Sequence, residues 1–274
     1  MTIYYVLSPL VLGQTRILND QIIFRLVSIY SIERMILFHI ARSVIDTTTM
    51  PGIRIWGILI LEPITVLTNL ILALTSLWAA YHLKRAGNKG KVLYFARLFF
   101  IWIAIGTFVG GVVGHALLHY TGIWGKIPGW YISMVGVAML ERAAIIQGRF
   151  YMKPGFGRFF SVFNYVEIAI FMVLSILTFN FLFVEIHAFY GLFVVVFCFS
   201  LYVFLQSKDK AVINIFVATF CGLLAALCHA MKWSIHTHFN YNDISHIFMT
   251  ISVIYYYKGY SKLDKSLIGH GSRL

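Results

Sequence analysis

Four histidines carry the chemistry that this sequence suggests: His115, His119, His229 and His246. Each of them lies near one end of a long apolar run. Ionisable side chains within membrane-spanning segments are costly and usually serve a function. Imidazoles supplied by several helices are also common ligands of catalytic zinc. The pattern therefore predicts a polar site at one end of a helix bundle, if these runs cross a membrane.

The composition is that of a membrane protein. The 274 residues are 60% hydrophobic and 12% charged, whereas soluble domains have roughly 45–50% apolar and about 25% charged residues. The formal charge of +12 would suit nucleic acid in a soluble chain. In a membrane protein, however, Lys and Arg in cytoplasmic loops set the orientation. We therefore expect no nucleic-acid partner.

Seven apolar runs reach the length of about 20 residues that a helix needs to cross the hydrocarbon core. Short links between several of them favour neighbouring antiparallel helices. The sequence thus predicts an all-α integral membrane protein, a bundle of seven transmembrane helices within residues 51–260. The predicted spans are residues 56–83, 93–120, 129–148, 161–180, 183–206, 211–232 and 244–260.

Basic residues gather in alternate loops, and this asymmetry predicts the orientation. Loops after the first, third, fifth and seventh spans hold most of the Lys and Arg, and the opposite loops hold few. Because cytoplasmic loops are enriched in these residues, we expect the N-terminus outside and the C-terminus in the cytoplasm. Residues 261–274 would then form a basic cytoplasmic tail.

The first fifty residues do not fit this scheme. Their apolar stretch, residues 21–40, is interrupted by Arg25, Glu33 and Arg34 and is a poor candidate for a span. One interpretation is an amphipathic helix lying in the membrane interface. The alternative is that residues 1–50 are an extension introduced by the gene prediction and that the natural start is Met50. Both interpretations stay open at this stage.

Once the orientation of the spans is set, the position of a residue in its span gives its expected depth in the membrane. His115 and His119 fall near the outer end of the second span, and residues four apart share a helix face. His229 falls near the outer end of the sixth span. Three histidines from two helices are therefore expected at one level, although His119 could be no more than an interfacial neighbour.

The first and seventh spans bring acids and amides to the same level. Glu62 is expected about two turns into the first span, and Asp243 and His246 begin the seventh. Thr68, Asn69 and Asn242 would lie beside them. Each acid also has a simpler interpretation: Glu62 followed by Pro63 could mark a helix start, and Asp243 could cap the last helix, as Asp often does.

Three further ionisable residues lie deeper, namely Glu141, Arg142 and Glu167. We expect them to form an internal ion pair or to be satisfied within the core, with no direct function.

Three short motifs resemble those of a superfamily of seven-helix membrane hydrolases that includes the alkaline ceramidases and the progestin and adiponectin receptor-like proteins. They are EPITVLTN at residues 62–69, GVVGH at residues 111–115 and NDISH at residues 242–246. The resemblance covers residues 51–260 and is closest to the ceramidase branch. It implies zinc bound by His115 and His246, with Glu62 as a nearby acid.

The chain departs from that family at two motif positions. Gly111 stands where the family has a serine, and Asn242 where it has the first histidine of the last pair. A third zinc ligand would have to come from elsewhere, and His229 is the preferred candidate. Zinc with three protein ligands activates a water molecule, for which Glu62 or Asp243 would shuttle protons. The missing serine leaves it open whether the protein is an enzyme.

The first functional hypothesis is a ceramidase-like, zinc-dependent hydrolase of a lipid amide or ester, with membrane lipids, for example a sphingolipid-like acyl amide, as substrates. The alternative is a non-catalytic lipid-binding or receptor-like protein on the same fold. A small transporter is a third option, but no inverted repeat supports it. The compact loops suit a bacterial cytoplasmic membrane. The sequence does not indicate an oligomeric state.

Overall fold

The computed structural model describes residues 47–85, 90–264 and 267. Most of the predicted extension at residues 1–50, including its interfacial helix, lies outside the described residues. The same is true of most of the predicted tail at residues 261–274.

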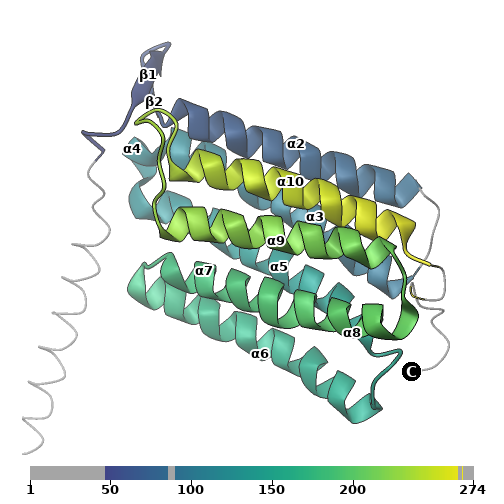
Figure 1. Ribbon diagram of the computed structural model, residues 1–274. Helices are drawn as coiled ribbons and strands as arrows, with labels where there is room; N and C mark the ends of the chain where they lie inside the picture. Colours follow the sequence, from purple (N-terminus) through teal and green to yellow (C-terminus); the bar gives the residue numbers. More distant parts are fainter. Residues whose placement is uncertain (1–46, 86–89, 265–266, 268–274) are drawn as a thin grey trace, which may run out of the picture. The chain divides into compact units, whose positions relative to one another are not determined.

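Helices make up almost all of the described chain, and they follow the predicted spans (Figure 1). The first is α2 (Pro63–Arg85), followed by α3 (Lys91–Val109) with its π-helical continuation η1 (Gly110–Ala116), and by the short α4 (Leu118–Thr121) and η2 (Gly122–Gly125). The others are α5 (Lys126–Gly148), α6 (Pro154–Thr178), α7 (Leu182–Phe189) continued by η3 (Tyr190–Phe197) and α8 (Cys198–Ser207), α9 (Ala211–Ala230) and α10 (Tyr241–Lys262).

Six helical segments of the described chain are long and apolar enough to cross a membrane, which is what an integral membrane protein requires. The segment that coincides with the seventh predicted span, α10, is of similar length but is not among the six. Its first turns hold Asn242, Asp243, Ser245 and His246, all polar residues. The helical fold class is thus confirmed, and six of its helical segments have the length and apolar composition to cross a membrane.

The start of the first predicted span is wrong. Residues Gly52–Ile55 and Ile58–Leu61 form an antiparallel hairpin, β1 and β2. Trp56 and Gly57 make its two-residue turn with φ angles of 49° and 83°, the left-handed pair that matches the twist of hairpin strands. A short apolar run does not by itself distinguish strand from helix. The helix therefore begins only at Pro63.

The helices of this part of the chain pack side by side (Figure 1). Helix α10 lies between α2 and α9, while α3 packs against α2 and α5, and α5 also contacts α6 and η3. The core between them is built from fully buried side chains such as Leu72, Phe100, Ile215, Tyr256 and Tyr260. Close van der Waals packing between such side chains holds neighbouring helices together within a membrane.

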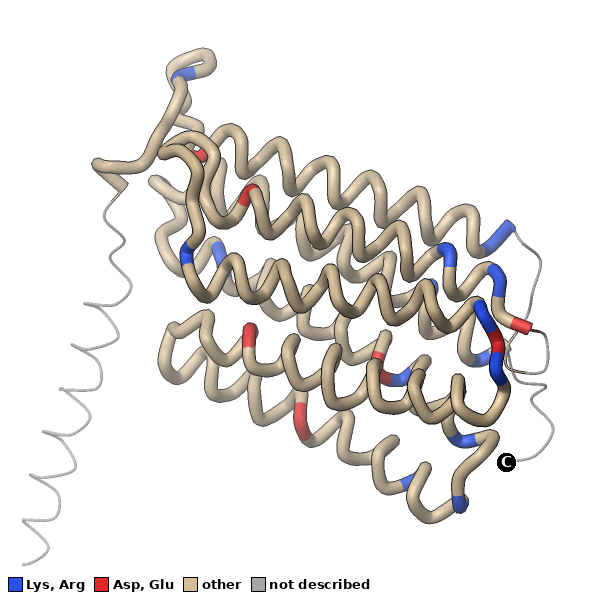
Figure 2. The backbone as a smooth tube through the Cα atoms, viewed as in Figure 1, with Lys and Arg blue, Asp and Glu red and all other residues tan. Residues whose placement is uncertain are grey.

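The two ends of the bundle differ in charge. One end, which we call the hairpin end, carries β1 and β2, the starts of α2, α7 and α10, and the ends of η1 and α9. Lys and Arg of the described residues gather at the other end, the basic end (Figure 2), in the terminal turns and links of the helices. All the predicted site residues belong to the hairpin end.

Candidate functional site

A buried carboxylate and an imidazole meet at the hairpin end. Nδ1 of His115 lies 2.7 Å from Oε2 of Glu62, and the two side chains are only 15% and 8% exposed. His115 comes from the π-helical η1, a rare geometry that is frequent at functional sites. Glu62 is the residue immediately before α2, so it marks a helix start and does not lie two turns inside a span.

The backbone at Glu62 is strained, with a φ of 46°. A side chain with a Cβ pays roughly 1–2 kcal/mol in this left-handed region, and such strain clusters at functional sites. Burial acts to raise the pKa of Glu62, but the His115 hydrogen bond and the charges of His115 and Lys126 more than offset it. The pKa of Glu62 is therefore lowered, and its carboxylate is held ionised.

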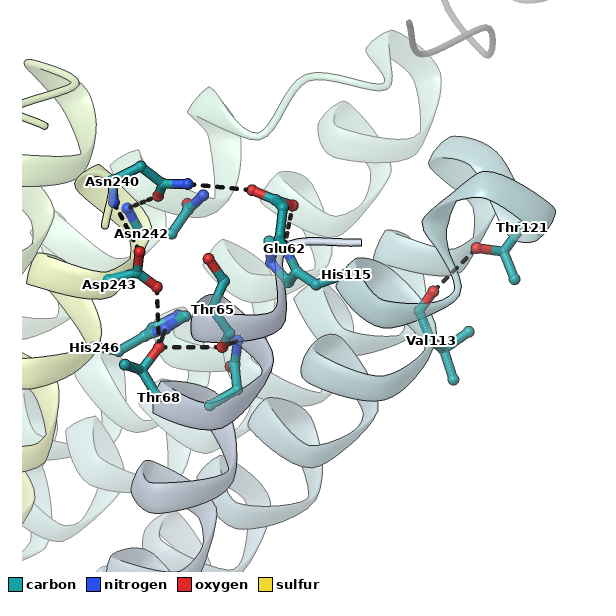
Figure 3. A network of polar contacts seen from close by, with 11 residues as sticks. Glu62, Thr65, Thr68, Val113, His115, Thr121, Asn240, Asn242, Asp243 and His246 are labelled. Carbon is teal, nitrogen blue, oxygen red and sulfur yellow. Dashed lines mark hydrogen bonds and ion pairs between the residues drawn. The ribbon is translucent and has the colours of Figure 1, made fainter. Parts of the chain in front are cut away.

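A second group of polar contacts joins α2 to α10 (Figure 3). Thr68 Oγ1 lies 2.9 Å from Nδ1 of His246 and 3.3 Å from Oδ1 of Asp243. Thr68 Oγ1 also lies 3.1 Å from the carbonyl oxygen of Thr65. The single hydroxyl hydrogen can serve only one of these acceptors at a time, so Thr68 couples the orientation of His246 to that of Asp243.

Asp243 caps α10. Its Oδ2 accepts a hydrogen bond of 2.7 Å from the backbone N–H of Asn240, in a capping box. The side-chain amide of Asn240 in turn donates to Oε1 of Glu62 at 3.4 Å. Both oxygens of Asp243 are thus engaged, which supports the capping interpretation of Asp243 over a proton shuttle. Asn240 links the two groups into one network, which we call the outer cluster (Figure 3).

A cavity of about 510 Å³ opens beside the outer cluster. Its polar wall lies at the hairpin end, where His115, Lys126, His229 and His246 face it. Further along the same helices the wall is apolar, with Phe99, Ile103, Leu192, Val253 and Tyr256. The cavity is therefore polar at one end and mostly apolar along its length, where Thr107, Ser133, His187 and Ser252 add polar groups.

His229 lines the cavity but does not join the outer cluster. Its Nδ1 lies 2.5 Å from Oε1 of Glu185 on α7, and its ring packs against Phe181 and Tyr241. Three histidines of the cavity wall share one arrangement, and we call His115, His229 and His246 the three cavity histidines. Nδ1 of each contacts an oxygen on another helix or at its start. Among the described residues, Nε2 of each has no hydrogen-bond partner. A hydrogen bond at Nδ1 fixes the orientation of the ring, so that Nε2 can act as a base or as a metal ligand.

The remaining predicted residues lie at different places. His119 does not share a face with His115, because Leu117 leaves the helical path (φ −97°, ψ 14°) between them. His119 is exposed and contacts Thr47 Oγ1 at 3.2 Å. Asn242 and Asn69 are buried cavity residues. The expectation of a shared His115–His119 face is therefore wrong.

Asn69 fills the space that a serine at position 111 would need. A Cβ built on Gly111 would lie 2.8 Å from Cβ of Asn69, closer than real Cβ atoms approach. Asn69 is held there by a 3.0 Å hydrogen bond to the carbonyl oxygen of Thr65. Gly111 thus allows η1 to approach α2 closely. A serine at this position, as in the family, would clash with Asn69.

The ligand atoms of the predicted zinc site are not gathered. Within the described part of the chain, a single set of three His, Cys, Asp or Glu residues brings its ligand atoms within 4.8 Å of one another, and it is Glu141, Glu167 and His187. His115, His229 and His246 line one cavity without forming such a set. Zinc at these three histidines stays a prediction.

Sequence reasoning overlooked three cavity residues. Lys126 was treated as a loop charge, yet it faces the cavity and acts electrostatically on Glu62 and His115. Glu185 pairs with His229, and the buried His187 pairs with Glu167. For Glu185 and His187 the position inside the predicted span 183–206 was the available signal, because such residues are rare there and usually functional.

Taken together, these features define a helical bundle with an internal cavity and six segments long and apolar enough to cross a membrane, consistent with an integral membrane protein. The family of unknown function DUF6962 matches residues 64–265. This match covers most of the chain, from the start of α2 to the end of α10, and the chain belongs to that family. No curated protein and no solved structure matches it.

Proposed function

We propose that the protein binds an amphipathic lipid in the cavity between its helices. The observation that carries this proposal is the division of the cavity wall into a polar end and an apolar length. A volume of about 510 Å³ lies within the usual range of roughly 300–1,000 Å³ for small-molecule sites. Polar groups at one end and apolar side chains along the rest suit one head group and part of an acyl chain.

The head group would meet a hydrogen-bonding and cationic surface. Lys126 supplies an ammonium, and His115 and His246 supply imidazole Nε2 atoms. Asn69 and Asn242 add amides. The ammonium of Lys126 and the amides of Asn69 and Asn242 offer donors to an acceptor oxygen, which favours a carbonyl-containing head group, such as the amide of a sphingolipid-like molecule or the ester of another acyl lipid.

The charge distribution supports the orientation expected from the sequence. Lys and Arg at the basic end would face the cytoplasm, which places the hairpin end and the polar part of the cavity outside. Helix α10 would also span, because it packs between the membrane-length α2 and α9 and its 22 residues reach about 33 Å at 1.5 Å per residue. A bacterial cytoplasmic membrane remains the proposed location.

Binding of a fluorescent N-acyl sphingoid lipid to the purified protein in nanodiscs tests this proposal. Saturable binding is expected, and the Lys126→Met variant should weaken it about tenfold, which corresponds to roughly 1.4 kcal/mol. His119→Ala is the matched control, because His119 is a polar residue of the same end of the bundle but is exposed and does not line the cavity. Binding that is non-saturable, or equally affected by His119→Ala, would refute the proposal.

Hydrolysis of the bound lipid is a second candidate, favoured by the Glu62–His115 pair. If Nδ1–H of His115 donates to the Glu62 carboxylate, Nε2 carries a lone pair and can act as a general base. It would take a proton from water as the water oxygen attacks the lipid carbonyl carbon. The imidazolium would then return that proton to the amine or alkoxide as the C–N or C–O bond breaks. Lys126 would stabilise the oxyanion.

The zinc ion that the family resemblance implies takes no part in this proposed hydrolysis, since the three imidazoles are not gathered around one point. Turnover of the same fluorescent lipid tests hydrolysis independently of binding. A hydrolase should release free fatty acid, and both His115→Ala and Glu62→Gln should abolish that release while the lipid still binds. Saturable binding without release would leave lipid binding as the function.

A further inference from the structure

A second polar group lies deep in the bundle, away from the outer cluster. Glu141 of α5, Glu167 of α6 and His187 of α7 place their ligand atoms within 4.8 Å of one another. All three side chains are buried, with at most 4% exposure. We call this group the inner cluster. The sequence predicted only a satisfied core acid or an ion pair here.

The hydrogen bonds of His187 fix its protonation pattern. Nε2 lies 3.1 Å from the carbonyl oxygen of Met134, which can only accept, so Nε2 carries the proton. In the neutral ring Nδ1 then bears a lone pair. That lone pair lies 2.7 Å from Oε1 of Glu167, and two lone-pair atoms at this distance need a cation or a proton to hold them together. A backbone carbonyl on one ring nitrogen is also the usual partner of a metal-ligating histidine.

Two carboxylate oxygens of the inner cluster have no partner among the described residues. They are Oε1 of Glu141 and Oε2 of Glu167. An unpaired buried carboxylate oxygen is costly. Asn164 donates to the other Glu141 oxygen at 3.2 Å, and it also accepts from Arg142 at 3.4 Å. Glu141 and Arg142 therefore meet through Asn164 and do not pair directly.

The backbone leaves room beside the unpaired oxygen of Glu141. A Cβ on Gly191 would lie 2.5 Å from Oε1 of Glu141. Gly191 is in the π-helix η3, a second instance of this rare geometry next to a polar cluster. His187 also lines the 510 Å³ cavity, so one member of the inner cluster adjoins the cavity.

We infer that Glu141, Glu167 and His187 bind one divalent first-row transition-metal ion. Two carboxylates carry two negative charges, and one divalent cation neutralises both. A ligand set of one imidazole and two carboxylates suits ions such as Zn²⁺ or Mn²⁺, whereas the imidazole makes Ca²⁺ and Mg²⁺ poorer partners. The inference is independent of the proposed lipid binding, and the inner cluster is distinct from the three cavity histidines.

Metal content of the purified full-length protein tests the inference. The protein is incubated with Zn²⁺ or, separately, with Mn²⁺, desalted and analysed by mass spectrometry. About one ion per chain should be retained, as expected of three buried protein ligands. Removing the ion with a chelator should lower the Tm, and adding Zn²⁺ or Mn²⁺ back should restore it, because a ligand that binds only the folded state stabilises it.

Variants assign the ion to its site. Glu141→Gln and Glu167→Gln keep the side-chain volume and should each reduce the retained metal at least tenfold. His115→Ala and His246→Ala are the matched controls and should retain it. If a Gln variant fails to fold, the metal-dependent Tm of the wild type still decides whether an ion is bound, and the two alanine variants show whether the cavity histidines bind it.

Two results would overturn the inference. The first is wild-type protein that retains neither ion and whose Tm does not respond to metal or chelator, in which case protons hold the inner cluster together. The second is metal that is retained by the Gln variants but lost in His115→Ala and His246→Ala. That outcome would support the zinc prediction for the cavity histidines and leave lipid binding to be judged by its own assay.

Discussion

The outer and inner clusters use the same residue types in opposite ways. In the outer cluster the carboxylate oxygens of Glu62 and Asp243 all accept hydrogen bonds, and the cluster faces a cavity. In the inner cluster Glu141 and Glu167 each keep one oxygen without a partner among the described residues, and both are buried. A network that lines a cavity and whose carboxylate oxygens all have partners suits a ligand that comes and goes. A network with unpartnered carboxylate oxygens suits a resident ion.

Exposure also distinguishes the inner cluster from the second histidine–carboxylate pair on the cavity wall. The His187–Glu167 pair is 0% and 4% exposed, whereas the His229–Glu185 pair on the cavity wall is 27% and 18% exposed. Water can therefore replace a lost partner at the His229–Glu185 pair but not at the buried His187–Glu167 pair. The following predictions test whether this difference controls stability and binding.

The largest effect is expected from His187→Leu. It leaves Glu167 buried and unpaired, which should lower the free energy of unfolding by about 3–5 kcal/mol. His229→Leu is the control and should cost only about 1 kcal/mol, near the range for exposed pairs. Thermal unfolding in detergent measures both. Equal losses in the two variants would show that burial does not distinguish the pairs.

Gly191→Ala should have the next largest effect. The added methyl group meets Glu141 and Val137 within 2.7 Å, and overpacking of this kind typically costs about 1–3 kcal/mol. The retained metal should also fall, because the Glu141 carboxylate must move. Gly110→Ala is the matched control in the other π-helix, since nothing lies within 4 Å of a Cβ there. Loss of stability in Gly110→Ala but not in Gly191→Ala would contradict the geometry.

Acid should weaken the outer cluster through Glu62. Because its pKa is lowered in the folded state, Glu62 stabilises the fold at pH values above the ordinary carboxyl pKa of about 4.3. That contribution is lost as the pH falls below this value and through the lowered pKa. Glu62→Gln should be less stable at neutral pH and should show a shallower loss of Tm on acidification. A wild type and a variant with parallel pH profiles would rule out this role.

The smallest effect is expected from His119→Ala. The side chain is exposed, so the free energy of unfolding should change by no more than about 0.5 kcal/mol. Metal retention and lipid binding should both be unchanged. A marked loss of either would place His119 back among the functional residues, as its spacing from His115 first indicated.

The errors in the sequence-based site have a common physical cause. Spacing of four residues places His115 and His119 on one face only if the helix is regular, and here η1 and the turn at Leu117 interrupt it. Likewise, Glu62 lies before a helix because the Trp56–Gly57 turn diverts the apolar run into a hairpin. Irregular backbone segments such as these cannot be recognised from the hydropathy of the sequence.

Hydropathy alone predicted the helices that are long and apolar enough to cross a membrane, and sequence position alone put the residues of the outer cluster near one end of them. Long apolar runs must bury their backbone polar groups in helices, whatever their neighbours. Only the tertiary structure decided which polar residues meet. Glu141, Glu167 and His187 lie on three different helices, and their encounter depends on how those helices pack and rotate. Contacts between distant segments follow from that packing, because no spacing along the chain encodes them.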